Sequence, residues 1–266
     1  MQASRPIGLF DSGVGGLAVA RVIKDLLPHE QLYYVGDTVH LPYGEQTALQ
    51  LQAYAKAIGS LLLRQNCKVI LIACNTATAA AADVLQDYVG PHVPVLNVVD
   101  PVVSYVKQQY TEKTVGLIGT NYTIQSSIYA QKFHALQAGI HLKVLATPLL
   151  VLMVEEGNFQ KQVLEDYLTH PQLTEIQALI LGCTHYLLIK KQIAHCYQNK
   201  IEIIDGPSLL AASLKALLIS HQLINPGNPI HRDQFVATKL TLGFQAATKH
   251  LFGQEVHLVT LPILDT

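Results

Sequence analysis

The sequence predicts an α/β protein in which helices cover both faces of parallel β-sheets. Short runs that are apolar throughout, such as "KVILIA" (68–73) and "ALILGC" (178–183), recur along the chain. Stretches with helical periodicity, such as "TALQLQAYAKAIGSLLLRQ" (47–65), separate these runs. Continuous apolar strands that alternate with amphipathic helices are typical of parallel sheets buried on both faces.

The strands are expected in the first four-fifths of the chain and are followed by a helical segment. Residues 208–266 contain two helical patterns, at 208–223 and 241–253, and we expect this segment to pack back onto the first half of the chain. The predicted strands cover residues 7–10, 31–36, 68–73, 93–98, 114–119, 142–147, 178–183 and 201–205.

The strand positions also repeat at a nearly constant spacing. The segment "IGL" (7–9) resembles "VGL" (115–117), and two cysteines, Cys74 and Cys183, lie 109 positions apart (183 − 74). Loose recurrence is common in α/β chains, but agreement at several elements predicts two similar four-stranded halves related by pseudo-twofold symmetry. The active site is then expected in the cleft between the halves. The predicted domains are residues 1–97 together with 208–266, and residues 98–207.

Composition argues against several classes of function. The formal net charge is −1 and the 18 Lys and Arg residues are scattered, so we expect no nucleic-acid partner. No apolar run reaches the ~18 residues of a membrane span, and the N-terminal segment lacks a signal peptide's apolar stretch, so we expect no membrane association. The four cysteines show no zinc-ligand spacing, so we expect no metal site and a reduced, cytosolic chain.

Two of these cysteines end apolar strands and precede polar residues. Cys74 opens "CNTAT" and Cys183 opens "CTHY", whereas Cys67 and Cys196 are expected to be inert. Ligands of open parallel sheets bind beyond the carboxyl ends of the strands, so we expect both thiols at one cleft. Helix N-termini there are expected to favour thiolates and to bind a carboxylate. Two thiols that flank one carbon can remove a proton and return one, which inverts configuration without an organic cofactor.

Two further residues are expected to assist the thiols. Asp11 would set the protonation of Cys74 and His185 that of Cys183, although Asp11 also fits a helix N-cap and His185 a core histidine. The glycines of "FDSGVGGLA" (10–18) fit a dinucleotide fingerprint as well, but the Asp11 charge would oppose a pyrophosphate. We expect instead that the glycines let the backbone approach a small acid, with Ser12 as a donor.

Two other segments are candidates for the site. In the loop "GDTVHLPYGEQ" (36–46), Tyr43 is expected to close over a small ligand and Gly44 to contact it, with an ordinary surface loop as the alternative. In "PLLVLMVEEG", Glu155 and Glu156 form a helix end, and one of them is a candidate support for the histidine after Cys183. The sequence does not choose between the two glutamates.

Taken together, these motifs resemble the bacterial glutamate racemases of the aspartate/glutamate racemase superfamily. The resemblance runs through "IGLFDSGVGGL", "YVGDTVHLPYG", "ACNTATA", "IGTNYTIQSSIY", "PLLVLMVEEG" and "LGCTHYLL", which span nearly the whole chain. It implies cofactor-independent interconversion of L- and D-glutamate for peptidoglycan synthesis, and a two-domain α/β fold, usually in a homodimer. The histidine after the second Cys-Thr favours glutamate over aspartate or hydantoins as substrate.

By position, the resemblance also implies roles for individual residues. Cys74 would deprotonate D-glutamate and Cys183 would deprotonate L-glutamate, with Asp11 and His185 assisting them. The substrate-binding residues that it implies are Asp11, Ser12, Tyr43, Gly44, Asn75, Thr76, Thr184 and His185.

Three segments depart from the pattern of that family. Val39-His40 stands where the family commonly has Ala-Arg, Asp100-Pro101-Val102 replaces Glu-Pro-Gly, and "ATKLTLG" (237–243) replaces a Thr-Gly-Asp-like turn. All three lie outside the proposed site, so they leave its chemistry unchanged and leave open the response to effectors and the subunit contacts.

Other functions are compatible with a cleft of this kind. An aspartate racemase is a near relative in chemistry, and a one-thiol decarboxylase is disfavoured because it needs only one proton donor. A two-lobed amino-acid-binding protein would tolerate serine at both thiols, and a nucleotide-dependent oxidoreductase would be stabilised by its cofactor.

Overall fold

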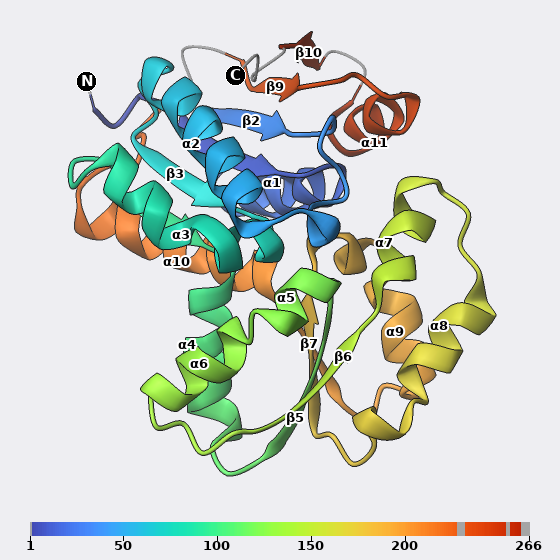
Figure 1. Ribbon diagram of the computed structural model, residues 1–266. Coiled ribbons are helices and arrows are strands. Elements are labelled where there is room, and N and C mark those ends of the chain that lie inside the picture. The colour runs from blue at the N-terminus through green and yellow to red at the C-terminus, as the bar shows by residue number, and fades with distance from the viewer. Residues whose placement is uncertain (1, 228–231, 254–255, 262–266) are drawn as a thin grey trace.

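Two parallel sheets, each flanked by helices, make up the fold (Figure 1). The structure is a computed structural model, and it describes residues 2–227, 232–253 and 256–261. Every strand pair in both sheets, over these residues, is parallel. The predicted α/β class is therefore confirmed.

The first sheet has six strands in the order β10-β9-β2-β1-β3-β4. Its central strands β1, β2 and β3 are buried at every residue, which explains why their sequences are apolar without alternation. The strands of this sheet are β1 (Ile7–Asp11), β2 (Leu32–Gly36), β3 (Val69–Ile72), β4 (Val95–Asn97), β9 (Gln234–Ala237) and β10 (His257–Thr260).

The second sheet has four strands in the order β6-β5-β7-β8. Chain order in this sheet matches that of β2-β1-β3-β4 in the first sheet, so the prediction of two similar four-stranded units is confirmed at the level of topology. The strands of the second sheet are β5 (Thr114–Gly119), β6 (His141–Ala146), β7 (Ala178–Gly182) and β8 (Glu202–Asp205).

Strands β9 and β10 were not expected from the sequence. Each has only four residues, and β10 lies at the edge of the sheet with exposed ends, so neither carries a long apolar run. Strand β9 pairs with β2, which attaches the C-terminal segment to the first sheet. The two helices predicted in this segment are present as α10 (Gly206–Ser220) and α11 (Leu242–Phe252).

Helices cover both faces of the first sheet. On one face, α2 (Ala48–Arg64) and α3 (Asn75–Val89) pack together over an apolar cluster that includes Phe10 and Ile70. On the other face, α1 (Gly15–Leu26) and α10 pack over a cluster that includes Ile7 and Leu9. Successive strand residues point to opposite faces, so both faces need apolar side chains. The remaining helices are α4 (Val99–Tyr110), α5 (Asn121–Gln125), α6 (Ile128–Ala135), α7 (Pro148–Glu155), α8 (Lys161–Leu168) and α9 (Lys190–Cys196), with 3-10 helices at Tyr43–Glu45, Pro171–Leu173 and Thr184–Ile189.

The apolar core continues from one sheet to the other. A single cluster contains Leu9 of β1, Val102 of α4, Leu117 of β5 and Leu214 of α10. Helix α10 packs against both α1 and α4 (Figure 1), so it contributes to the part of the core that the two sheets share. The domain boundaries expected near residues 97 and 207 stay a prediction.

Candidate active site

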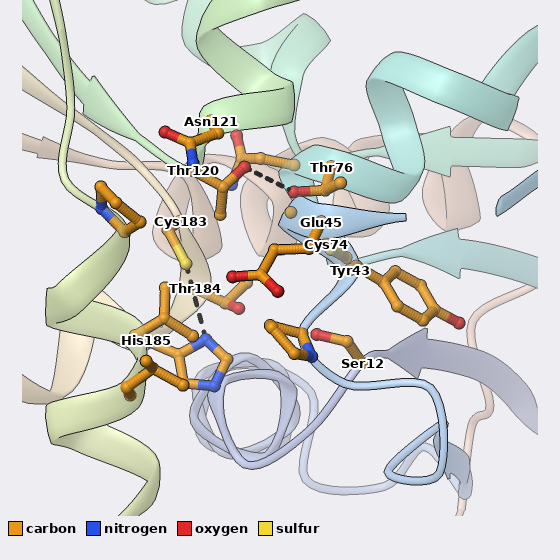
Figure 2. Close-up of a pocket in the computed structure, with 16 residues that line it drawn as sticks. Ser12, Tyr43, Glu45, Cys74, Thr76, Thr120, Asn121, Cys183, Thr184 and His185 are labelled. Carbon is orange, nitrogen blue, oxygen red and sulfur yellow. Dashed lines mark hydrogen bonds between the residues drawn. The ribbon is translucent and has the colours of Figure 1, made fainter. Parts of the chain in front are cut away.

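A cavity lies between the carboxyl ends of the two sheets (Figure 2). Ser12 and Cys74 line it from the ends of β1 and β3, and Thr120 and Cys183 line it from the ends of β5 and β7. In each sheet these two strands are neighbours at which the direction of strand order reverses. Open α/β sheets bind ligands at such switch points. The structure thus brings both predicted thiols to one cavity from different sheets.

Cys74 is the N-cap of α3 and is 6% exposed. Its Sγ accepts a hydrogen bond of 3.5 Å from the Ala77 N–H. Burial raises the pKa of the Cys74 thiol, the Asp11 carboxylate raises it further, and the Ala77 amide opposes only part of this rise. The amides at the start of α3 act in the expected direction, but removal of the sulfur from water outweighs them and the net change is upward.

Cys183 has a different environment. It precedes a 3-10 helix, not an α-helix, and its Sγ lies 3.5 Å from Nδ1 of His185 (Figure 2). The other ring nitrogen of His185, Nε2, lies 2.5 Å from Oε1 of Glu155. Burial would lower the pKa of His185, but Cys183 and Glu155 hold it well above its usual value. Cys183 and Glu155 therefore favour the protonated imidazole at this position.

The structure decides which glutamate supports this histidine. Glu155 contacts His185 and also accepts a hydrogen bond of 3.0 Å from the Val14 N–H, near the start of α1. Glu156 is exposed. The Glu155 carboxylate therefore links α7, the 3-10 helix after Cys183 and the N-terminus of α1.

Asp11 is fully buried at the end of β1. Its carboxylate accepts hydrogen bonds from the Gly13 N–H at 3.0 Å and from the Thr184 hydroxyl at 3.1 Å. Burial raises the pKa of Asp11, although the charge of His185 opposes the rise. Asp11 acts on Cys74 through its charge, while its hydrogen bonds join β1 to the turn after β7.

Side chains from the second half of the chain pack closely against the glycines after Asp11. A Cβ on Gly13 would lie 2.3 Å from a Glu155 oxygen, and a Cβ on Gly15 would lie 2.4 Å from the Thr184 hydroxyl. A Cβ on Gly15 would also lie 2.8 Å from the backbone nitrogen of His185, so this glycine in particular lets the second half of the chain approach α1. These glycines therefore serve contacts within the protein, and the expectation that they also let the backbone approach a small acid stays a prediction.

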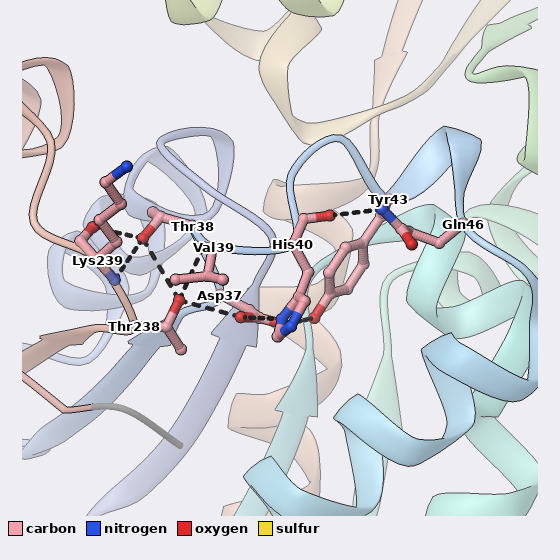
Figure 3. Close-up of polar contacts among 8 residues, drawn as sticks. All are labelled: Asp37, Thr38, Val39, His40, Tyr43, Gln46, Thr238 and Lys239. Carbon is pink, nitrogen blue, oxygen red and sulfur yellow. Dashed lines mark hydrogen bonds and ion pairs between the residues drawn. The ribbon is translucent and has the colours of Figure 1, made fainter. Parts of the chain in front are cut away.

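The loop after β2 contributes its backbone to the cavity. Tyr43 and Gly44 line the cavity, but the Tyr43 ring points away from it and donates a hydrogen bond of 2.7 Å to Asp37 (Figures 2 and 3). The ring is therefore not a lid. A Cβ on Gly44 would lie 2.8 Å from Cβ of Thr120, so the glycine allows the loop to touch the second half.

Asn75 and Thr76 also connect the two halves. Asn75 accepts a hydrogen bond of 2.7 Å from the Tyr129 hydroxyl. Thr76 Oγ1 lies 2.9 Å from Thr120 Oγ1 and 3.3 Å from Thr123 Oγ1. Thr76, Thr120 and Cys74 all line the cavity (Figure 2).

Sequence reasoning missed three polar residues that line the cavity, Thr120, Asn121 and Glu45, and also the apolar lining residues Pro42, Pro148, Val151 and Leu152. Thr120-Asn121 follows the apolar run of β5 just as Cys74-Asn75 follows β3, and this parallel was an available signal. Glu45 follows Gly44, and Figure 2 shows its carboxylate pointing towards the cavity.

Comparisons with known proteins agree with this geometry. The model of a family described as Asp/Glu/Hydantoin racemase matches residues 18–214. The chain belongs to this racemase family. A glutamate racemase of Streptococcus pneumoniae (strain Hungary19A-6) is 35% identical over 96% of this chain and 97% of its own length.

Solved structures of the family share the whole fold. A glutamate racemase from Francisella tularensis, crystallised in complex with D-glutamate, is 33% identical, with a TM-score of 0.89 over 99% of this chain and 100% of its own. A glutamate racemase from Thermus thermophilus, in complex with β-chloro-D-alanine, is 34% identical, with a TM-score of 0.84 over 98% and 99% of the two chains.

No helix within residues 2–227, 232–253 and 256–261 is long and apolar enough to span a membrane. The same part of the chain contains no group of three or more His, Cys, Asp or Glu residues arranged to hold a metal ion.

Proposed function

We propose that this chain interconverts L- and D-glutamate by proton transfer between two cysteine thiols. The observation that carries the proposal is that Cys74 and Cys183 line one cavity from separate sheets. The full-length likeness to glutamate racemases, one of them solved with D-glutamate, supports glutamate as the substrate. D-glutamate made in this way supplies peptidoglycan synthesis.

The reaction balances without a redox partner. The Cys183 thiolate takes the α-proton of L-glutamate, and the electron pair stays on the α-carbon and its carboxylate. The Cys74 thiol then gives its own proton to the opposite face of that carbon, which forms D-glutamate. Cys74 is left as the thiolate and Cys183 as the thiol, which is the form that accepts D-glutamate. No electron is gained or lost, so the thiols themselves supply the chemistry, and we propose that no cofactor takes part.

The electrostatics of the two thiols match this sequence of steps. Burial and Asp11 raise the pKa of Cys74, which keeps its proton available for donation. On the other side of the cavity, Nδ1 of His185 lies 3.5 Å from Sγ of Cys183, so this histidine can exchange a proton with that sulfur. His185 stays charged because Cys183 and Glu155 raise its pKa against the effect of burial. We therefore assign Cys183 as the base for L-glutamate and Cys74 as the base for D-glutamate, with Asp11 and His185 assisting.

The polar groups of the cavity wall suit an amino acid with two carboxylates. Hydroxyl and amide donors of Ser12, Asn75, Thr76 and Thr184 line or adjoin the space between the thiols. The loop at 43–44 adds its backbone. We assign the substrate contacts to residues that line the cavity, namely Ser12, Tyr43, Gly44, Asn75, Thr76, Thr184 and His185. Asp11, also a predicted contact, is not among the lining residues and adjoins them through its hydrogen bond from Thr184.

The proposed racemase activity also bears on where the protein acts and on how it assembles. The reaction needs free thiols, which reducing compartments maintain, so we place it in the cytoplasm. We also propose a homodimer, as the resemblance to the racemases implies. Sedimentation of the purified chain tests this state.

Isotope exchange tests the proposal. Purified chain with L-glutamate in D2O should lose optical rotation while deuterium enters the α-carbon, whereas L-aspartate serves as the control substrate. Cys74→Ala should stop racemisation but still exchange the α-proton of L-glutamate, because Cys183 remains. Cys183→Ala should do the same for D-glutamate only. Racemisation that survives either substitution would end the two-thiol scheme.

A further inference from the structure

The loop between β2 and α2 contains a buried carboxylate that the proton transfers do not use. Asp37 follows β2 and is fully buried. Its backbone N–H donates a hydrogen bond of 2.9 Å to the carbonyl oxygen of Asp11. Asp37 therefore lies one strand away from the cavity at the same edge of the sheet.

Three side chains converge on the Asp37 carboxylate (Figure 3). The Tyr43 hydroxyl donates to Oδ2 at 2.7 Å and the Thr238 hydroxyl donates to Oδ1 at 3.0 Å. Nδ1 of His40 lies 2.9 Å from both carboxylate oxygens. A buried carboxylate with this many partners is held in one orientation, because both of its oxygens are engaged by side chains from different segments.

The same carboxylate joins the loop to the C-terminal segment. Thr238 follows β9, and its Oγ1 also accepts a hydrogen bond of 2.9 Å from the Val39 N–H. The Lys239 N–H donates to the Thr38 hydroxyl at 2.9 Å. Two of the segments in which this chain departs from the racemase pattern, Val39-His40 and 237–243, therefore meet at one carboxylate.

Residues 40–46 of the loop are also fixed by contacts outside the Asp37 carboxylate. The His40 ring stacks on Tyr54 of α2, with ring centroids 3.8 Å apart. The Gln46 side chain donates to the His40 carbonyl oxygen at 3.2 Å. Gly44 packs against Thr120 with no room for a Cβ. A shift of Tyr43 must therefore move the cavity wall at Gly44.

We propose that Asp37 is a positioning residue that holds the backbone of residues 43–44 in place for glutamate, with Thr238 of the C-terminal segment as its brace. Asp37 acts through Tyr43 and touches neither thiol. The proposal rests on the glutamate racemase activity proposed above. Its effect is on substrate binding, because the proton transfers occur on other elements.

Two substitutions and one matched control test this role. Asp37→Asn keeps the shape but offers one acceptor oxygen where three donors converge, and Thr238→Val removes a brace far from the thiols. Each should raise the KM for glutamate about 10-fold while kcat stays within about threefold, as expected for lost binding contacts. Glu30→Gln is the control, since Glu30 is a buried carboxylate just before β2, at the opposite end of that strand. It should lower the melting temperature without changing KM.

Amide hydrogen exchange gives a second readout that does not depend on turnover. Asp37→Asn and Thr238→Val should speed exchange at residues 38–46, and Glu30→Gln should leave this segment protected. Unchanged KM and unchanged exchange in both variants would overturn the proposal, as would a fall in kcat at constant KM. If the unmodified chain does not racemise glutamate, the proposed function fails, while faster exchange at 38–46 would still support the role of Asp37 in holding this loop.

Discussion

The hydroxyl of Thr184 donates a hydrogen bond of 3.1 Å to the buried carboxylate of Asp11, across 173 positions of sequence. Asp11 ends β1 in the first sheet, and Thr184 begins the 3-10 helix after β7 in the second. The two elements that carry the candidate catalytic groups are therefore joined directly at the cavity, through a carboxylate that has no access to water.

Thr184→Val removes this bond while conserving shape. A buried acceptor that loses its donor costs about 1–3 kcal/mol, so the melting temperature should fall. The pKa of Asp11 should rise further, because Thr184 now lowers it. We expect kcat/KM to fall by about tenfold or more. A loss of about 1.4 kcal/mol corresponds to a factor of ten, and the cost of the lost bond lies in this range. Thr184→Ser retains the hydroxyl and should behave like the parent; equal losses in both variants would contradict the hydrogen-bond explanation.

Glu155→Gln tests the support of His185. The substitution removes the charge that raises the pKa of His185, so the imidazole cation beside Cys183 becomes less stable. We expect kcat/KM to fall about 10- to 100-fold, the range of a positioned acid–base effect. The fall must be the same for both enantiomers, because the equilibrium constant of racemisation is one.

Glu156→Gln is the matched control for this prediction, because Glu156 is the neighbouring residue and is exposed. It should leave kcat/KM unchanged. If the two substitutions have equal effects, the Glu155–His185 contact has no part in the reaction.

The pH profile should reflect the raised pKa of Cys74. The proposed cycle needs one thiol and one thiolate, and loss of the remaining proton at high pH stops it. Because burial and Asp11 raise the pKa of Cys74, this proton is retained as pH passes the ordinary thiol value of about 8.5. We expect kcat/KM to stay level up to about pH 9, above that ordinary value. Asp11→Asn removes an anion that raises the pKa of Cys74, so any alkaline decline should move to lower pH.

Glu30→Gln should destabilise the fold without altering the site. Lys68 Nζ lies 2.5 Å from Oε2 of Glu30, and both side chains are buried. Burial lowers the pKa of Lys68 and Glu30 opposes that change, so the lysine depends on its partner for its charge. Breaking a buried pair costs about 3–5 kcal/mol, which urea unfolding would measure. Lys161→Gln breaks an exposed pair with Glu165 and should leave the unfolding free energy nearly unchanged.

Much of the fold could be predicted because buried parallel strands have a distinctive sequence pattern. Strands such as β3 and β7 are apolar at every position, and a thiol followed by polar residues marks the end of each. Strands β9 and β10 lacked this pattern because they are short and lie towards the edge of the sheet. Their place beside β2 is fixed by long-range hydrogen bonds instead.

The sequence by itself determined the α/β class, the repeated four-strand unit and the two thiols at strand ends, because each depends on local pattern and chain direction. Only the tertiary structure decided that Glu155 and not Glu156 supports His185, and that the Tyr43 ring turns to Asp37 instead of the cavity. It also decided that burial and Asp11 raise the pKa of Cys74 despite the place of this thiol at a helix N-terminus. These outcomes depend on burial and on contacts such as Val14 to Glu155, which are 141 positions apart. Such contacts exist only after the sheets have packed together.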